Sequence, residues 1–353
     1  MDVPSVTEKG APPEAERAVS KATWRQTALR FAIGSVATGA FLWLFLRQAA
    51  IGDAWREIRK LPGWSIAGSV GFVVVNSAFI ALRWRYLFAA ARYQTSTPRL
   101  FAIFCVGAGA NNVLPARGGD LLRIAATSQQ FKVPAFVAVG TLFAERLLDG
   151  LVLSVWILMG ALMIGESGVL LLAGVGLSAG TALGMVLVGL AARRPEDTET
   201  FVWRLTGRLP PRWRQRIGRA MANFVLGLGA FRQRKHLSRV LWTSVAIWLA
   251  NFGLYVLLGK SFGVELGVGG YFLLEGVGNL ALGVPATAAG LGSFDYLTLV
   301  SAKELGVSDE LATPYVLTVH AMVVLPVTIL GLLCLKSAFP RAFSSIGNWM
   351  RSR

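Results

Sequence analysis

Apolar residues occur along this chain in long blocks separated by short polar or basic segments. Six blocks are long enough to cross a bilayer, because about 20 helical residues span a hydrocarbon core of roughly 30 Å. They are residues 27–47, 64–82, 134–164, 168–192, 240–260 and 311–335. A helix satisfies its own backbone hydrogen bonds in lipid. The pattern therefore predicts an all-α polytopic membrane protein with six full transmembrane helices.

Two further apolar regions, residues 100–132 and 261–310, contain only stretches that are too short to cross, interrupted by Gly and Pro. Non-helical backbone at membrane depth is tolerated where it is buried in protein or lines a watery cavity. We therefore expect each region to form a re-entrant helical hairpin, which enters the membrane and leaves it on the same side.

Basic residues beside the apolar blocks predict the orientation of the chain. Residues 193–239 hold twelve Lys or Arg and three acids, and the segments 83–99 and 336–353 are also basic. These segments should be cytoplasmic, whereas the surroundings of Glu166 and residues 260–270 carry little positive charge and should lie outside. Both termini are then cytoplasmic, the first hairpin enters from inside and the second enters from outside.

The two hairpins share a pattern although they face opposite sides. The first contains Asn-Val-Leu-Pro-Ala-Arg-Gly-Gly-Asp at 112–120, and the second contains Val-Pro at 284–285 and Gly-Leu-Gly-Ser-Phe-Asp at 290–295. In each case a short helix, a Val-Pro or Val-Ser step and a full span follow. Arg146 and His320 both stand thirteen residues after that valine. Inverted repeats with interrupted helices are typical of secondary transporters; two unrelated Gly- and Pro-rich loops are the alternative.

Composition changes this picture little. Hydrophobic residues make up 54% of the 353 residues and charged residues 15%, against about 25% charged residues in soluble domains. The net charge of +16 would suggest nucleic acid for a soluble protein, but here basic residues flank apolar blocks, so we expect no nucleic-acid partner. The two cysteines and two histidines are too scattered to predict a disulfide or a metal site.

The chain divides into a membrane domain with a tail on each side. Residues 1–26 are polar and predict a disordered cytoplasmic tail, residues 27–335 form the membrane domain, and residues 336–353 form a basic cytoplasmic tail. Within the basic loop 193–239, apolar residues from Trp213 to Phe231 recur at helical spacing beside arginines. This amphipathic helix either lies on the anionic inner leaflet or packs on the bundle as an ordinary cytoplasmic helix.

Ionisable residues inside the predicted spans are the candidates for a site. Glu145 lies near the bilayer centre, where a charge costs at least roughly 2.5–3.5 kcal/mol unless it is paired or hydrated. We expect Glu145 or Asp149 to pair with Arg117 or Arg123, and at least one arginine to face a cavity. The guanidinium fork binds phosphate oxygens bidentately, so the arginines can attract a lipid phosphate. A purely structural ion-pair network is the alternative.

The full set of expected substrate-binding residues combines these charges with the glycines, prolines and amide of the two hairpins. Glycine lets backbone approach a headgroup closely. The set is Asn112, Pro115, Arg117, Gly119, Asp120, Arg123, Glu145, Arg146, Asp149, Pro285, Gly290, Gly292, Asp295 and His320. Glu275 and Asn279 are further candidates in the second half, whereas mid-span Asn76 and Asn251 are expected to hold helices together.

Three motifs together resemble the lysylphosphatidylglycerol synthase transmembrane family, also described as flippase-like. They are Asn-Asn-Val-Leu-Pro-Ala-Arg-Gly-Gly-Asp-Leu-Leu-Arg at 111–123, Glu-Arg-Leu-Leu-Asp at 145–149 and Pro-Ala-Thr-Ala-Ala-Gly-Leu-Gly-Ser-Phe-Asp at 285–295. The resemblance runs from about residue 27 to residue 335. It implies a flippase-type membrane core, whose best understood members move aminoacylated phospholipid between leaflets.

This chain departs from the family pattern in its second half. Ala289 precedes Gly290 where the family usually has two glycines, Phe294-Asp295 stands where Arg-Glu is usual, and His320 occupies a basic position of the last span. Full-length synthases also carry a large soluble catalytic domain after the membrane part, and only about eighteen residues follow Leu335 here. Aminoacyl transfer is therefore not expected of this chain.

The expected function is translocation of an anionic or aminoacylated phospholipid, or of a lipid-linked headgroup, across the inner (cell) membrane. No metal, P-loop or Gly-x-Ser-x-Gly pattern is present in the sequence, so we expect no enzyme activity and no cofactor. A membrane partner or lipid-handling subunit of a separate glycosyltransferase or lipid synthase is the alternative. A membrane-embedded transferase that uses Glu145 or Asp120 as a base is a third possibility.

Overall fold

The computed structural model describes residues 36, 38–49, 51–114, 117–165, 168–282 and 288–340. These residues form helices joined by short connections, with no β-strand among them. Five of the helices are long and apolar enough to cross a membrane: α3 (Gly63–Ala90), α6 (Ala135–Met163), α7 (Val169–Arg193), α10 (Arg234–Phe262) and α13 (Asp309–Ala338). The chain is therefore a multi-pass membrane protein, as its sequence predicts. The start of the sixth expected span, residues 27–35, lies outside the described residues, and residues 38–48 are helical.

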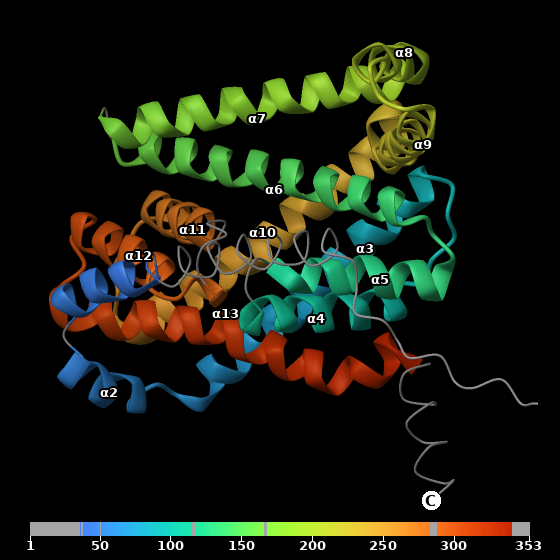
Figure 1. Cartoon of the computed structure of the whole chain (residues 1–353). Coiled ribbons are helices and arrows are strands. Elements are labelled where there is room, and N and C mark those ends of the chain that lie inside the picture. The colour runs from blue at the N-terminus through green and yellow to red at the C-terminus, as the bar shows by residue number, and fades with distance from the viewer. Residues whose placement is uncertain are drawn as a thin grey trace, which may run out of the picture.

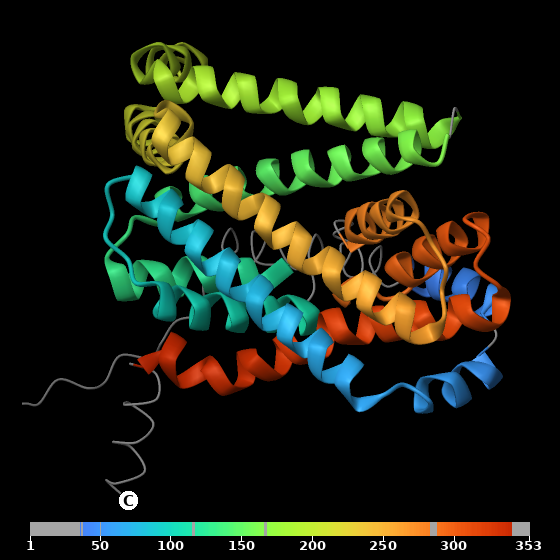
Figure 2. The ribbon, with the colours of Figure 1, turned by 180° about the vertical axis from the view of Figure 1, so that it is seen from behind.

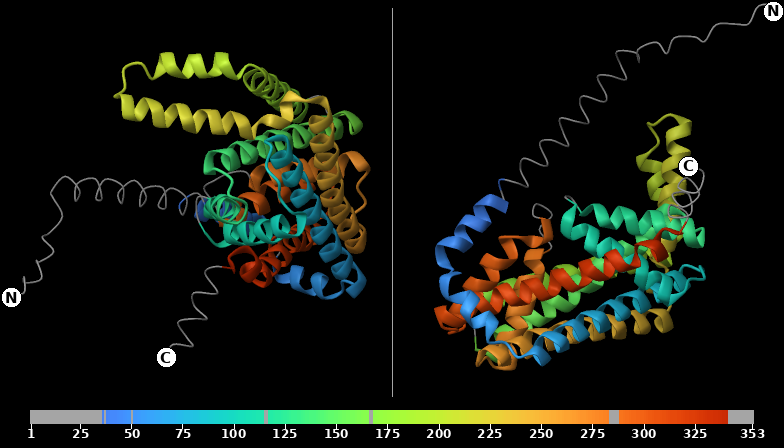
Figure 3. Two further views of the ribbon diagram at one scale, coloured as in Figure 1. Left: turned by 90° about the vertical axis from the view of Figure 1, so that its right-hand side faces the viewer. Right: turned by 90° about the horizontal axis from the view of Figure 1, so that it is seen from below.

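Four shorter helices form two pairs at opposite ends of the bundle (Figure 1). The first pair is α4 (Thr97–Val113) with α5 (Gly118–Phe131), and the second is α11 (Val268–Leu282) with α12 (Ser293–Glu304). The short helix η3 (Ala288–Gly290) precedes α12. The view from behind (Figure 2) and the view from below (Figure 3) keep the two pairs at opposite ends.

One short helix of each pair packs on a long helix from the other half of the chain. The α4 helix of the first pair packs along α13, which belongs to the second half of the chain, whereas α11 of the second pair packs along α6 of the first half. Between them, α3 and α10 pack side by side along their length (Figure 2). Each half of the chain therefore supplies the packing surface for the other half's short helices.

The α3 helix is longer than expected. The sequence predicts a span that ends at residue 82 and a cytoplasmic loop from Arg83, but α3 continues to Ala90. Arg83, Trp84, Leu87 and Phe88 are all buried on it, so the loop prediction is wrong for residues 83–90. Hydropathy drops at Arg83 because of its charge, yet the helix continues because that charge is paired inside the protein.

Short helices cover the polar end of the bundle near the end of α13 (Figure 1). They are α8 (Pro195–Leu205), α9 (Pro211–Gly227) and η2 (Gly229–Arg232). A Cβ atom on Gly140 of α6 would collide with the carbonyl oxygen of Phe224, and one on Gly227 with that of Val137. The carboxyl end of α9 therefore packs directly on the bundle, as one of the two alternatives predicts, while Trp213 at its other end is 58% exposed.

The α2 helix (Ile51–Arg59) was not predicted, and neither was α8. The α2 helix follows the first span and contacts α13, and it lies at the same end of the bundle as α12 (Figures 1 and 3). Its nine residues contain basic Arg56 and Arg59. Such a helix is too short and too polar to stand out as an apolar block.

Candidate functional site

A buried ion pair joins the first helix pair to α6. Arg123 of α5 donates through both terminal nitrogens to the two carboxylate oxygens of Glu145, and each bond is 3.0 Å long. Both residues are 2% exposed. The Arg123 guanidinium also stacks 4.3 Å from the ring centroid of Trp84, which donates to Thr141 Oγ1. This pairing is one of those predicted, and its bidentate geometry is the strong form of the interaction.

A second buried pair was missed by sequence reasoning. Arg83 of α3 donates to both oxygens of Asp149 at 2.7 and 3.2 Å and to Ser244 Oγ of α10 at 3.0 Å. Trp248 donates from its indole to the same carboxylate at 3.2 Å. Asp149 thus pairs with Arg83 and not with Arg117 or Arg123. The available signal was the spacing of Trp84, Leu87 and Phe88, which continues the apolar face of the helix.

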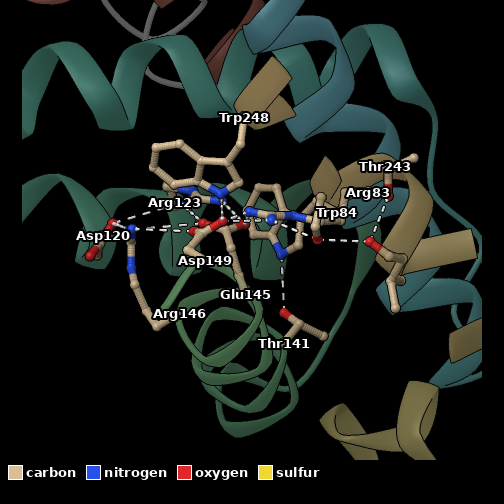
Figure 4. A network of polar contacts seen from close by, with 12 residues as sticks. Arg83, Trp84, Asp120, Arg123, Thr141, Glu145, Arg146, Asp149, Thr243 and Trp248 are labelled. Carbon is tan, nitrogen blue, oxygen red and sulfur yellow. Dashed lines mark hydrogen bonds and ion pairs between the residues drawn. The ribbon is translucent and has the colours of Figure 1, made fainter. Parts of the chain in front are cut away.

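Arg146 stands apart from these tight pairs (Figure 4). Its guanidinium lies 3.6 Å from Asp120, 3.8 Å from Glu145 and 3.9 Å from Asp149, which are ion-pair distances beyond ordinary hydrogen-bond length. The side chain is 44% exposed. Its donors are therefore held near three carboxylates but remain free to bind another anion.

A cavity of about 590 Å³ lies beside this network. Its walls come from α3, α4, α5, α6, α10, α11, η3 and α13, and they include the ion-pair residues Arg83, Arg123, Glu145, Arg146 and Asp149. Arg117, which precedes α5 and has a left-handed backbone with φ of 55°, also lines it. Arg117 donates to the carbonyl oxygen of Leu282 at 3.2 Å, so the first helix pair touches the end of α11 at the cavity wall.

The second half of the chain holds a smaller buried pair. His320 of α13 lies with Nδ1 2.7 Å from Asp295 Oδ1 of α12 and with Nε2 2.9 Å from the carbonyl oxygen of Ala289. The other oxygen of Asp295 accepts from the backbone of Gly292 at 2.9 Å. Phe294 lies against the histidine ring, with centroids 4.6 Å apart. These contacts fix the backbone before α12, where Ala289 has a φ of 52°.

The residues predicted for the site fall into three groups. Those that line the cavity are Asn112, Arg117, Arg123, Glu145, Arg146, Asp149 and Gly290. Those beside it are Gly119, Asp120, Gly292, Asp295 and His320, and Pro115 and Pro285 lie outside the described residues. Gly119 is needed where α5 crosses α4, because a Cβ atom there would collide with the Gly107 carbonyl oxygen.

Half-buried amides of α3, α10 and α11 complete the polar interior. Asn76 donates to the Ile247 carbonyl oxygen at 2.8 Å and Asn251 to Glu275 at 3.1 Å, so both hold helices together as expected. Asn279 donates to the Tyr255 hydroxyl at 3.3 Å. Within the described part of the chain, no cluster of three or more His, Cys, Asp or Glu side chains is arranged to hold a metal ion.

The long apolar helices and the charged interior define a multi-pass membrane protein built around an arginine-rich cavity. The model of one family, described as the lysylphosphatidylglycerol synthase TM region, matches residues 28–331. The chain therefore belongs to this family, in agreement with the resemblance of its motifs. No curated protein that was compared with the chain matches it.

Proposed function

We propose that this protein is a lipid translocase of the cell membrane, which moves a phosphate-bearing headgroup between leaflets through the central cavity. In this proposal residues 38–48 belong to a sixth span, and both termini are cytoplasmic. The helix pairs α4–α5 and α11–α12 act as re-entrant hairpins from opposite sides. The chain itself carries out no covalent chemistry.

Matching ion pairs in the two halves support the inverted repeat. Asp120 is the third residue of α5 and Asp295 the third residue of α12. Arg146 lies 3.6 Å from the first aspartate, and His320 lies 2.7 Å from the second. Each pair thus joins a short helix to the long helix that follows it. Two copies that face opposite leaflets give a physical route to alternating access.

The observation that carries the proposal is the exposed Arg146 among otherwise buried and paired charges. Glu145 and Arg146 lie about 15 Å along α6 from Ala135, at 1.5 Å per residue. A charge at such depth is expensive in lipid and usually faces a watery pathway. Arg146 and Arg117 line the same cavity and together offer a two-sided arginine clamp for phosphate oxygens.

Movement of the headgroup would also require the hairpin tips to separate. The contact from Arg117 to the Leu282 carbonyl oxygen is a single bond of 3.2 Å. A phosphate that recruits Arg117 would compete with that carbonyl for the guanidinium. Substrate binding would therefore weaken the link between the two halves, which is the coupling that a translocase needs.

The test is reconstitution into liposomes that contain phospholipid with a fluorescent nitrobenzoxadiazole group on one acyl chain. Dithionite quenches only lipid in the outer leaflet, so translocation of inner-leaflet lipid should add a slower phase of quenching that grows with the amount of protein. Arg146→Gln should lower the translocation rate at least tenfold, since this substitution removes the free guanidinium but leaves both buried pairs. The matched control is Arg99→Gln, because Arg99 is exposed and does not line the cavity.

Absence of movement for every phospholipid class tested, with well-folded protein, would refute the translocase and favour a partner subunit of a separate glycosyltransferase or synthase. Equal rates for Arg146→Gln and the unaltered protein would refute the role of Arg146. The basic helix α9 would face the anionic inner leaflet, so an added protease should cut it only from the cytoplasmic side.

A further inference from the structure

The carboxylates around the cavity are already occupied by arginines. Both oxygens of Glu145 accept from Arg123, and both oxygens of Asp149 accept from Arg83. The third carboxylate, Asp120, accepts from the Asn111 amide at 3.2 Å. An incoming ammonium group could bind Glu145 or Asp149 only by displacing a buried guanidinium, which would be left without its partner, and Asp120 does not line the cavity.

The charge balance around the cavity also favours an anion. The four arginines at the wall are Arg83, Arg117, Arg123 and Arg146. They face the carboxylates of Asp120, Glu145 and Asp149, so this group of seven side chains carries one positive charge in excess. A positive potential in a low-dielectric site attracts a phosphate and repels a cationic headgroup.

Five asparagines give the cavity a second kind of polar group. They come from α3, α4, α10 and α11, and all five are partly exposed. They are Asn76, Asn111, Asn112, Asn251 and Asn279. Each donates through its amide nitrogen to a protein oxygen. No described residue donates to their side-chain oxygens. The oxygen of Asn111 is enclosed in the protein, and those of the other four remain as acceptors, which suit hydroxyl groups.

We infer that the cavity selects an anionic headgroup that carries hydroxyl groups, a phosphate with a polyol or sugar, and discriminates against an aminoacylated, cationic headgroup. This inference rests on the proposed translocase and names its substrate class. Arginine donors meet the phosphate, and amide acceptors meet the hydroxyls. A cavity of about 590 Å³ falls within the range of small-molecule sites.

One further acid, Glu275, contacts a residue of the cavity wall. Glu275 is fully buried on α11, accepts from Asn251 through Oε1, and has no described partner at Oε2. It is not part of the cavity wall, and Asn251 lies between it and the open volume. An ammonium group that reached Glu275 would have to displace that amide, so the wall itself presents no free carboxylate.

The experiment compares four probes in the same liposomes, each labelled on an acyl chain so that the headgroup is unchanged. They are phosphatidylglycerol and phosphatidylinositol, which carry hydroxyls; phosphatidic acid, which is anionic without a polyol; and lysyl-phosphatidylglycerol, which is cationic. The first two should move at least tenfold faster than lysyl-phosphatidylglycerol and severalfold faster than phosphatidic acid. A lysyl lipid that moves as fast as phosphatidylglycerol would overturn the inference and leave the translocase standing.

Two substitutions at Asn279 test separately whether the cavity selects lipids by headgroup charge and by headgroup hydroxyl groups. Asn279→Asp adds an unpaired carboxylate to the wall, and the Tyr255 hydroxyl, 3.3 Å away, can donate to it. It should raise the rate for the lysyl lipid relative to phosphatidylglycerol severalfold. Asn279→Leu removes the acceptor and should narrow the gap between phosphatidylglycerol and phosphatidic acid. Unchanged ratios in both variants would contradict the roles assigned to the amides.

Binding to the purified full chain in detergent gives a readout that does not depend on transport. Phosphatidylglycerol should compete more strongly than lysyl-phosphatidylglycerol for a fluorescent phosphatidylglycerol probe. The reverse order would refute the headgroup preference even if no lipid crossed the bilayer. Movement of none of the four lipids, with the binding preference intact, would refute translocation alone.

Discussion

Breaking the buried pair between Arg123 and Glu145 should destabilise the protein far more than removing the whole pair. At 3.0 Å and an effective dielectric constant of about 20, the attraction is worth about 5 kcal/mol. Loss of one partner from a buried pair typically costs about 3–5 kcal/mol, because the other charge stays buried. Replacement of both by apolar residues of similar volume is often neutral or stabilising.

The two single substitutions should differ in size. Without Glu145, three arginines lie close together, and the nearest remaining carboxylate to Arg123 is Asp120 at 3.8 Å. Without Arg123, Glu145 keeps Arg83 and Arg146, each 3.8 Å away. We therefore expect Glu145→Leu to cost about 5 kcal/mol and Arg123→Met about 3 kcal/mol. The double variant should lie within about 1 kcal/mol of the unaltered protein.

The assay is reversible unfolding in mixed micelles by added dodecyl sulfate, followed by circular dichroism and tryptophan emission. The free energy of unfolding of all four proteins gives a double-mutant cycle, and the interaction term isolates the pair. Additive effects of the two single substitutions would refute the assignment of this pair as a mutually dependent buried contact. Arg99→Met provides a control at an exposed arginine.

Three further predictions test other parts of the network. Arg83→Leu leaves the carboxylate of Asp149 with an indole donor and with Arg146 3.9 Å away, so the free energy of unfolding in the same assay should fall by about 3 kcal/mol; no loss would show that α3 is not held by this charge. Gly119→Ala should cost about 1–3 kcal/mol through overpacking against α4, whereas Gly176→Ala, which meets nothing within 4 Å, should be neutral. His320→Leu removes the contacts to Asp295 of α12 and to Ala289 before it, so a cysteine engineered at exposed position 291 should react severalfold faster with a water-soluble maleimide; an unchanged rate would count against that anchoring role.

Much of the fold could be predicted because hydropathy dictates which helices cross a membrane. The long helices α6, α7, α10 and α13 agree with the predicted blocks within about six residues. A long uncharged run such as that of α7 can be interpreted only as a transmembrane helix. The short pairs were predicted from Gly and Pro in apolar sequence. The exchange of packing partners, with α4 on α13 and α11 on α6, could not be derived, because it depends on contacts between residues more than 100 positions apart.

Site residues could be predicted where a charged residue lies deep inside a predicted span. They could not be predicted where a charged residue follows an apolar run and so resembles the end of a transmembrane helix. Glu145 and Arg123 stood out because a lone acid deep in a span needs a cation. Arg83 was missed because a basic residue after an apolar run is also the usual sign of the cytoplasmic boundary. Only its three-dimensional partner, Asp149 at 2.7 Å, distinguishes a buried cation from a boundary residue.

The proposed repeat would let two matching pairs carry different tasks. In both halves an aspartate at the third position of a short helix meets a side chain of the next long helix. In the first half that side chain is Arg146, which is 44% exposed and lines the cavity. In the second half it is His320, which is 6% exposed and has both ring nitrogens turned toward acceptors, the Asp295 carboxylate and the Ala289 carbonyl.

The difference lies in the donors that each side chain has left to offer. Both ring nitrogens of His320 already contact groups inside the protein, the Asp295 carboxylate and the Ala289 carbonyl, whereas a guanidinium has five donors, and those of Arg146 are not tightly bound. In the proposed translocase the first pair would meet a headgroup, and the second would hold the backbone that bounds the cavity. Recognition and anchoring would then follow from the identity of a single residue at matching positions of the proposed repeat.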